Sequence, residues 1–152
     1  MRKHDNDAVP VILLWGQLLV VLQRELSDSD AVQLTHNVLH TLRRTGARGL
    51  AIDASGLRVM DSHLCSVLAR LAAAVRLMGA RCVLCGMGAE VAMTLQAMGI
   101  ELENLDSAHS LEDALEHLGI HATRIDESAK AWELLDALLE RDHRARESDQ
   151  PA

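Results

Sequence analysis

A serine and two carboxylates lie within ten residues of one another, in an arrangement that suits a phosphorylation site. Asp53 ends an apolar stretch, a Ser-Gly turn follows, and Asp61 and Ser62 stand where a long helical pattern begins. Asp61 or Ser62 is the predicted N-cap of that helix, because a side-chain oxygen there accepts a backbone N–H of the first turn. The N-terminal end of a helix also favours a phosphate. The local pattern leaves two interpretations open, an ordinary Asp-Ser cap and a phosphorylated serine.

Other pairs of reactive residues predict no catalytic or metal site. Cys82 and Cys85 have the spacing of a C-x-x-C motif, but we expect them on a strand, where residues three apart face opposite sides. We therefore predict buried, separate thiols. His36 and His40 share one helix face without an evident third ligand, which favours a solvated face over a zinc site. His63 follows Ser62 directly, and this separation turns the two side chains apart on a helix, so we expect no catalytic triad and no enzyme.

Composition excludes several classes of protein. The chain has 152 residues, a formal net charge of -7, no Phe or Tyr and only two Trp. An acidic chain with so few aromatic side chains is not expected to bind nucleic acid. No apolar run approaches the roughly 20 residues of a membrane span, and no signal peptide is evident. Together with three cysteines, an odd number, these features predict a cytoplasmic protein with reduced thiols.

The elements that must position the serine predict an α/β fold. Two apolar runs, Val9–Trp15 and Leu18–Gln23, flank Gly16-Gln17 and indicate an opening β-hairpin. Strands then alternate with helices, which favours crossover connections and a largely parallel sheet. We expect strands at 49–53 and 81–85, a weak strand at 100–105, and helices at 28–45, 62–78, 89–98 and 110–118.

The charge-rich C-terminal end is predicted to be an addition to one domain. We expect a flexible N-terminus at 1–8, the domain at 9–120 and an extension at 121–152. Within the extension, Trp132, Leu135 and Leu139 mark one face of an amphipathic helix at about 126–143, followed by a disordered tail. The helix either packs on its own domain or contacts a partner or a further subunit.

Three segments, 53–62, 76–84 and 86–100, together resemble the STAS domain family. Within that family the likeness is to stressosome scaffold proteins of the RsbS and RsbR type and to anti-sigma factor antagonists. The resemblance covers residues 9–120 and implies a mixed sheet with helices. It implies that Ser62 is phosphorylated by a serine kinase of the RsbT type, with Asp53 and Asp61 flanking the switch. The resemblance also implies that His63 belongs to the same partner-binding surface and that Thr94 matches a second phosphorylated position of RsbR-type proteins.

The resemblance also implies a mode of action and partners. The expected function is a non-enzymatic scaffold that binds a kinase or switch partner and releases it once Ser62 is phosphorylated. It would assemble with RsbR-like STAS paralogues as a homo- or hetero-oligomer, without a cofactor or metal. Two alternatives remain, a SpoIIAA-type antagonist that binds an anti-sigma kinase, and a module that senses a small ligand near the loop at 86–89.

Overall fold

The computed structural model describes residues 8–103, 105–121, 133 and 136–138. Contacts group the chain into two units, Met1–Ile120 and His121–Ala152, and each is described by itself. In the second unit, residue 133 and residues 136–138 are helical. The rest of the amphipathic helix predicted at about 126–143 lies outside the described residues, as do the predicted tail and residues 1–7.

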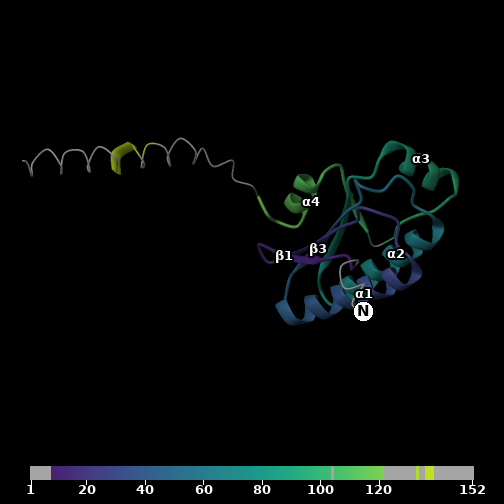
Figure 1. The fold of residues 1–152 in the computed structure, drawn as a ribbon, viewed down its shortest axis with the longest axis horizontal. Coiled ribbons are helices and arrows are strands. Elements are labelled where there is room, and N and C mark those ends of the chain that lie inside the picture. Colours follow the sequence, from purple (N-terminus) through teal and green to yellow (C-terminus); the bar gives the residue numbers. More distant parts are fainter. Residues whose placement is uncertain (1–7, 104, 122–132, 134–135, 139–152) are drawn as a thin grey trace, which may run out of the picture. The chain divides into compact units, whose positions relative to one another are not determined.

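The first unit is a five-stranded sheet with helices between the strands, which confirms the predicted α/β class (Figure 1). The strands lie in chain order, with β1 antiparallel to β2 and the other pairs parallel. The strands are β1 (Val11–Leu14), β2 (Gln17–Val21), β3 (Gly49–Asp53), β4 (Arg81–Cys85) and β5 (Asp106–Ala108). The helices are α1 (Asp28–Thr45), α2 (Ser62–Leu77), α3 (Ala89–Ala97) and α4 (Leu111–His117). None of the described helices is long and apolar enough to cross a membrane.

Strand alternation divides the core into two layers. Leu18 and Val20 of β2 belong to the larger apolar cluster, which also holds the buried faces of α1, α2 and α3. Leu19, between them, belongs to a smaller cluster with Ala114 of α4. Successive strand side chains point to opposite faces, so one apolar run serves both layers. Figure 1 accordingly shows α4 on one side of the sheet and α1 and α2 on the other.

The prediction of a strand at 100–105 is wrong in its position. The fifth strand is Asp106–Ala108, and it pairs with β4 from Val83 to Cys85. Ile100, Leu102 and Leu105 are half-buried and pack against the larger cluster from the connecting segment. The spacing of these apolar residues resembles that of a strand, because a loop that covers a core can also alternate between buried and exposed residues.

Candidate functional site

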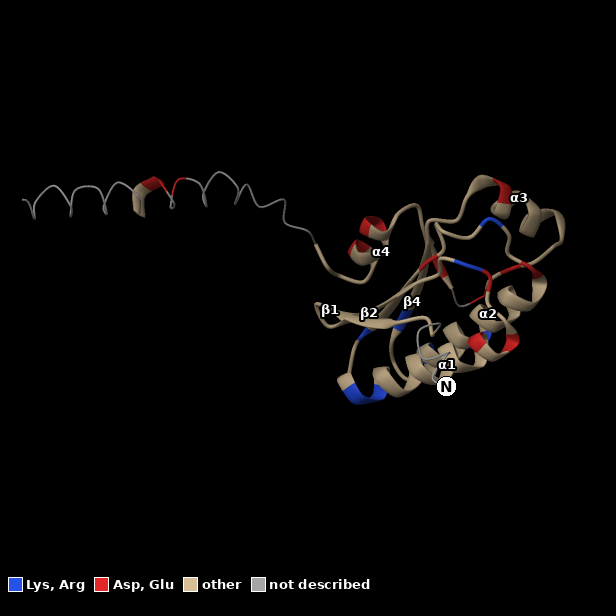
Figure 2. Ribbon diagram, in the orientation of Figure 1, with Lys and Arg blue, Asp and Glu red and all other residues tan. Residues whose placement is uncertain are grey.

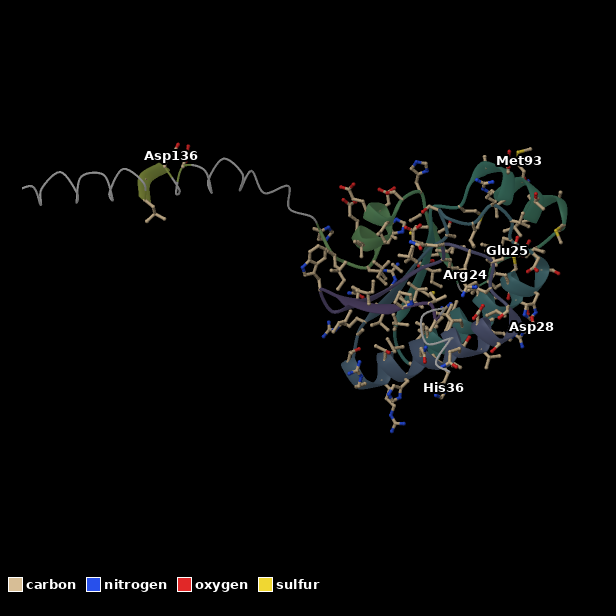
Figure 3. The ribbon with its side chains drawn as sticks, in the orientation of Figure 1. Arg24, Glu25, Asp28, His36, Met93 and Asp136 are labelled. Atoms are coloured by element: carbon tan, nitrogen blue, oxygen red, sulfur yellow. The ribbon has the colours of Figure 1, made fainter. Side chains whose placement is uncertain are left out.

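The predicted site lies at the carboxyl ends of the parallel strands. β2, β3 and β4 are parallel, so their carboxyl ends and the starts of α1, α2 and α3 lie together at the same end of the sheet. Figure 3 shows Arg24, Glu25 and Asp28 at this end, where α1 begins, with His36 farther along α1. The β3–α2 connection at this end carries Ser62.

Asp53 anchors the β3–α2 connection. Its Oδ1 accepts the backbone N–H of Ser55 at 2.9 Å and so closes a tight turn after β3. Gly86, which follows β4 with a φ of +73°, lies against the same turn. A Cβ on Gly86 would come within 2.8 Å of Asp53 Oδ1 and 2.9 Å of the Ser55 Cβ. The two neighbouring connections are therefore packed together, and only glycine fits at the contact.

The N-cap of α2 is Asp61 and not Ser62. Asp61 Oδ1 accepts the backbone N–H of Leu64 at 2.7 Å, and Asp61 has an extended backbone (φ -84°, ψ 170°). This geometry decides between the two predicted caps. Ser62 is the first residue of α2, its side chain is exposed, and its hydroxyl makes no hydrogen bond to the described residues.

Some backbone N–H groups in the first turn of α2 lack an acceptor among the described residues. The N–H of Leu64 bonds to the Asp61 side chain, and that of Cys65 bonds to the Asp61 carbonyl at 3.0 Å. The N–H groups of Ser62 and His63 have no acceptor in the described part of the chain. Such unpaired donors at a helix start favour an anionic group beside them.

His63 joins the starts of two helices. Its Nε2 lies 2.9 Å from Oδ1 of Asp28 in the first turn of α1, and about half of the His63 side chain is exposed. Asp28 was missed as a site residue, because its only signal in the sequence is helix-start chemistry. Nothing local predicts that two helix starts separated by more than thirty residues come together.

The start of α1 is capped by a network of its own. Ser27 and Asp30 form a capping box, in which each side chain accepts the other's backbone N–H, at 3.1 and 3.0 Å. Asp30 also accepts a hydrogen bond from Arg24 at 3.2 Å. The backbone N–H of Ser27, more than the Arg24 charge, holds the pKa of Asp30 below its usual value.

Thr94 lies on a different element from Ser62. It is exposed on α3, and its hydroxyl donates to the Glu90 carbonyl of the same helix at 2.8 Å. The start of α3, at Gly88, has no side-chain cap. The structure therefore gathers Asp53, Asp61, Ser62 and His63 at this end of the sheet through the β3–α2 unit, whereas Thr94 comes from the β4–α3 unit.

The three cysteines are buried and separate. Cys82 belongs to the larger apolar cluster and Cys85 to the smaller one, so they face opposite sides of the sheet as predicted. Burial, with a lesser effect of Asp106, raises the pKa of Cys82 to about 12. Burial and then Asp53 raise the pKa of Cys85 to about 11, and burial and then Asp61 raise that of Cys65. These protonated thiols are poor nucleophiles.

Two hollows flank the site. A groove of about 530 Å³ lies between α1 and α2, and its lining includes His63 and Asp28 together with the apolar side chains Val32, Leu39 and Val67. A second hollow of about 450 Å³ lies between α3 and residues 99–107, and of the loop at 86–89 only Met87 lines it. The first hollow adjoins Ser62 along the chain and is the more apolar of the two.

Comparison with known proteins agrees with this architecture. The sequence profile of the STAS domain matches residues 8–114. The chain belongs to the STAS domain family. A relative of this STAS protein is the RsbT co-antagonist protein RsbRA of Bacillus subtilis, 26% identical over 110 residues, which are 72% of this chain and 40% of RsbRA. The chain thus spans about two fifths of the length of that relative.

Solved STAS structures resemble the described fold. A serine-to-glutamate variant of RsbS from Moorella thermoacetica superposes with a TM-score of 0.64 and 31% identity, over 73% of this chain and 94% of RsbS. A chain from the molecular architecture of the stressosome, a signal integration and transduction hub, gives the same TM-score and identity over 72% and 96% of the two chains. This STAS protein is therefore related to both RsbR and RsbS proteins.

Proposed function

We propose that this STAS protein is a non-enzymatic switch subunit of a stressosome-type assembly, phosphorylated at Ser62 by a serine kinase of the RsbT type. The observation that carries the proposal is the separation of two roles at the start of α2. Asp61 caps the helix, whereas the Ser62 hydroxyl is exposed and bonded to none of the described residues. A hydroxyl without a structural role can be modified without loss of the fold.

The relatives support the choice of partner. RsbRA is named as a co-antagonist of RsbT, and a structurally similar chain is part of the stressosome. The similar RsbS structure carries glutamate in place of a serine, a substitution that adds negative charge. We infer that this chain assembles with RsbR-like STAS proteins, as a homo- or hetero-oligomer in the cytoplasm, and presents Ser62 to the kinase.

The chemistry of the modification suits the start of a helix. Ser62 Oγ bonds to the γ-phosphorus of ATP, the bond from that phosphorus to the ADP oxygen breaks, and the hydroxyl proton passes to a base of the kinase. The product carries a charge of about -1.5 to -2. The N–H groups of Ser62 and His63, which have no acceptor among the described residues, and the helix dipole stabilise that charge, so the domain stays folded.

Release follows from the charge already present at this end of the sheet. Asp53 and Asp61 both precede Ser62 along the β3–α2 connection, and Asp28 faces its neighbour His63. A partner that binds the unmodified chain fits a surface on which the neutral Ser62 hydroxyl lies near several carboxylates. A phosphate adds negative charge and bulk at that contact, and beside carboxylates it disrupts an interface through like-charge repulsion and through the cost of desolvating the added charge. The unmodified chain therefore holds the kinase, and the phosphorylated chain releases it.

The first test maps the phosphate. The full chain is incubated with ATP and an RsbT-type kinase, and modified peptides are located by mass spectrometry. Phosphate is expected on Ser62 and is lost in Ser62→Ala. Ser66→Ala, one turn later on the same helix and also exposed, is the matched control and keeps it, as does Thr94→Ala. Phosphate on Ser66 or Thr94 with Ser62 unmodified would contradict the proposal.

The second test measures release. Calorimetric titration of the kinase into Ser62→Asp should give an affinity at least about tenfold weaker than wild type, because a fixed negative charge replaces the hydroxyl. Ser66→Asp should bind as wild type does. Equal affinity of Ser62→Asp and wild type would rule out release by charge. A small complex with an anti-sigma kinase, in place of the RsbT-type kinase, would favour the SpoIIAA-type alternative.

A further inference from the structure

The two edges of the sheet differ in chemistry. β5 is three residues long, and its Asp106 pairs with Arg81 at 3.2 Å, so this edge is short and charged. β1 reads Val-Ile-Leu-Leu, without a charge, and Figure 2 shows no acidic or basic colour along it. Exposed edges are usually blocked by charge, proline or a bulge, because they otherwise pair with further strands. The outer edge of β1 has none of these devices within the strand.

The backbone groups of β1 that face outward follow from the hairpin. Trp15 and Gly16 form its two-residue turn, which makes Leu14 and Gln17 a hydrogen-bonded pair. Alternation then directs the N–H and C=O groups of Ile12 toward β2. Those of Val11 and Leu13 point to the open edge, where no described residue pairs with them.

The side chains at this edge are apolar and accessible. Ile12 is 44% exposed and Leu13 is 52% exposed, and the two belong to opposite faces of the hairpin. Trp15 is 72% exposed at the turn, with a φ of +49°. Two-residue turns of this kind favour Asn or Gly, and a bulky side chain with positive φ is strained. An exposed indole at a strained position adds little to the core of its own domain, and indoles are common anchors of protein interfaces.

We propose that β1 pairs in antiparallel fashion with β1 of a second copy of this chain, across a two-fold axis at Ile12. The pairing places Val11 of each copy opposite Leu13 of the other, so that all four outward-facing residues exchange their free N–H and C=O groups. The two five-stranded sheets become one continuous sheet. A second copy fits because the edge is complementary to itself in hydrogen bonding and carries no charge that would oppose its own approach.

This interface leaves the phosphorylation site accessible. Gln17 begins β2 at the end of the sheet where β3 also begins, and the Gly16 carbonyl accepts the N–H of Arg48 at 3.2 Å just before β3. The turn at Trp15 thus lies at the amino-terminal end of the parallel strands. Ser62 follows their carboxyl ends, so pairing through β1 is independent of the proposed switch.

A cysteine substitution at the axis tests the geometry. In the proposed dimer the two Ile12 side chains lie opposite each other as a non-hydrogen-bonded pair, the spacing at which cross-strand cysteines form a disulfide. Mild oxidation of full-length Ile12→Cys should give a covalent dimer. Leu77→Cys, at the 90% exposed end of α2, is the matched control and should stay monomeric on denaturing gels. The native cysteines are buried and contribute little. Equal cross-linking of both variants, or of neither, overturns the proposal.

Sedimentation equilibrium gives a second, independent measurement. Wild type should show a monomer–dimer equilibrium. Ile12→Lys sets two ammonium groups directly opposite each other and should weaken dimerisation by at least about tenfold. Leu77→Lys, the same kind of substitution on α2, should leave it unchanged, with far-UV circular dichroism confirming that both variants fold. A wild type that remains monomeric at all concentrations, or that associates equally in both variants, rejects the interface.

Discussion

Two strand–loop–helix units, β3–α2 and β4–α3, run from the carboxyl ends of neighbouring parallel strands, but their helices begin differently. Asp61 caps α2 with its side chain, whereas α3 begins at Gly88 without a side-chain cap. α2 extends over 16 residues and buries six of them, and α3 extends over nine and buries two. The α2 start is therefore the more firmly fixed of the two.

The difference bears on the proposed phosphorylation switch. A loosely held helix can move when a charge is added to it, which reduces the effect of that charge on a bound partner. A firmly held helix keeps the added charge in place, so the charge acts directly on the partner. Ser62 stands on the more firmly fixed helix, and its hydroxyl bonds to none of the residues that the structure describes. Thr94 stands on the shorter helix, and its hydroxyl is bonded to the Glu90 carbonyl. The comparison favours Ser62 as the residue whose modification changes binding.

The largest effect is expected where the two units touch. Gly86→Ala places a Cβ within 2.8 Å of Asp53 Oδ1 on a backbone with a φ of +73°. The positive φ and the overlap together should lower the free energy of unfolding by about 3 kcal/mol. Urea denaturation followed by circular dichroism measures the loss. The β3–α2 connection should also loosen, since its Asp53 turn loses its packing partner.

Gly88→Ala is the matched control for that substitution. Gly88 has an ordinary φ of -69°, and a Cβ there meets nothing within 4 Å. Its free energy of unfolding should lie within about 0.5 kcal/mol of wild type. Comparable losses in the two variants would show that the β4–α3 loop is not held by contact with the β3–α2 turn.

Thiol reactivity reports on the burial of the native cysteines and on the nearby carboxylates of the β3–α2 unit. The pKa of Cys85 is raised to about 11, by burial first and Asp53 second, and that of Cys65 is raised by burial and Asp61. At pH 8 the thiols of Cys85 and Cys82 should react with an alkylating reagent at least about 100-fold more slowly in the native state than in the unfolded chain, and Cys65 should also react more slowly in the native state. The single added thiol of Leu77→Cys should react rapidly. Rapid modification of Cys65 or Cys85 in the folded chain would refute this account.

The same raised pKa values make stability fall in alkali. The native state holds the Cys85 and Cys82 protons more tightly than the unfolded chain, so their contribution is complete below the unfolded pKa near 9. It is lost as the pH rises toward about 11 for Cys85 and about 12 for Cys82. Urea denaturation from pH 8 to 11 should show this decline, and Cys85→Ala should reduce its slope.

The order of the elements and the residues at the start of α2 were predictable, because local chemistry determines them. The apolar stretch ending at Asp53 and the Asp61-Ser62 helix start follow from periodicity and capping preferences. The sequence did not decide which of Asp61 and Ser62 is the cap, since both side chains suit the position. The contacts of His63 with Asp28 and of Gly86 with Asp53 join distant segments, and no local pattern encodes them. The position of β5 was predicted wrongly for a related reason, because the half-buried residues of the preceding loop have the same local pattern as a strand.

Removal of the α2 cap should have a moderate effect. Asp61→Ala deletes the acceptor of the Leu64 N–H and should lower the free energy of unfolding by about 1 kcal/mol. Asp61→Asn keeps a capping oxygen without the charge and should lose less than half of that. Thermal or urea denaturation of both variants separates the two contributions. An Asp61→Ala variant as stable as wild type would mean that the Ser62 hydroxyl can replace the cap, which would return Ser62 to a structural role.

A cap added to α3 should have the smallest effect and would bring the two units closer. Gly88 already has the extended backbone of an N-cap (φ -69°, ψ 155°), and there is open space for a side chain. Gly88→Asp should raise the free energy of unfolding by about 0.5 kcal/mol, from a capping hydrogen bond and from a less flexible unfolded chain. Gly88→Ala shares the second contribution but not the first, so the difference between the two variants isolates the cap. If Gly88→Asp is no more stable than Gly88→Ala, the first turn of α3 is not free to accept a cap, and the contrast with α2 lies in helix length and burial alone.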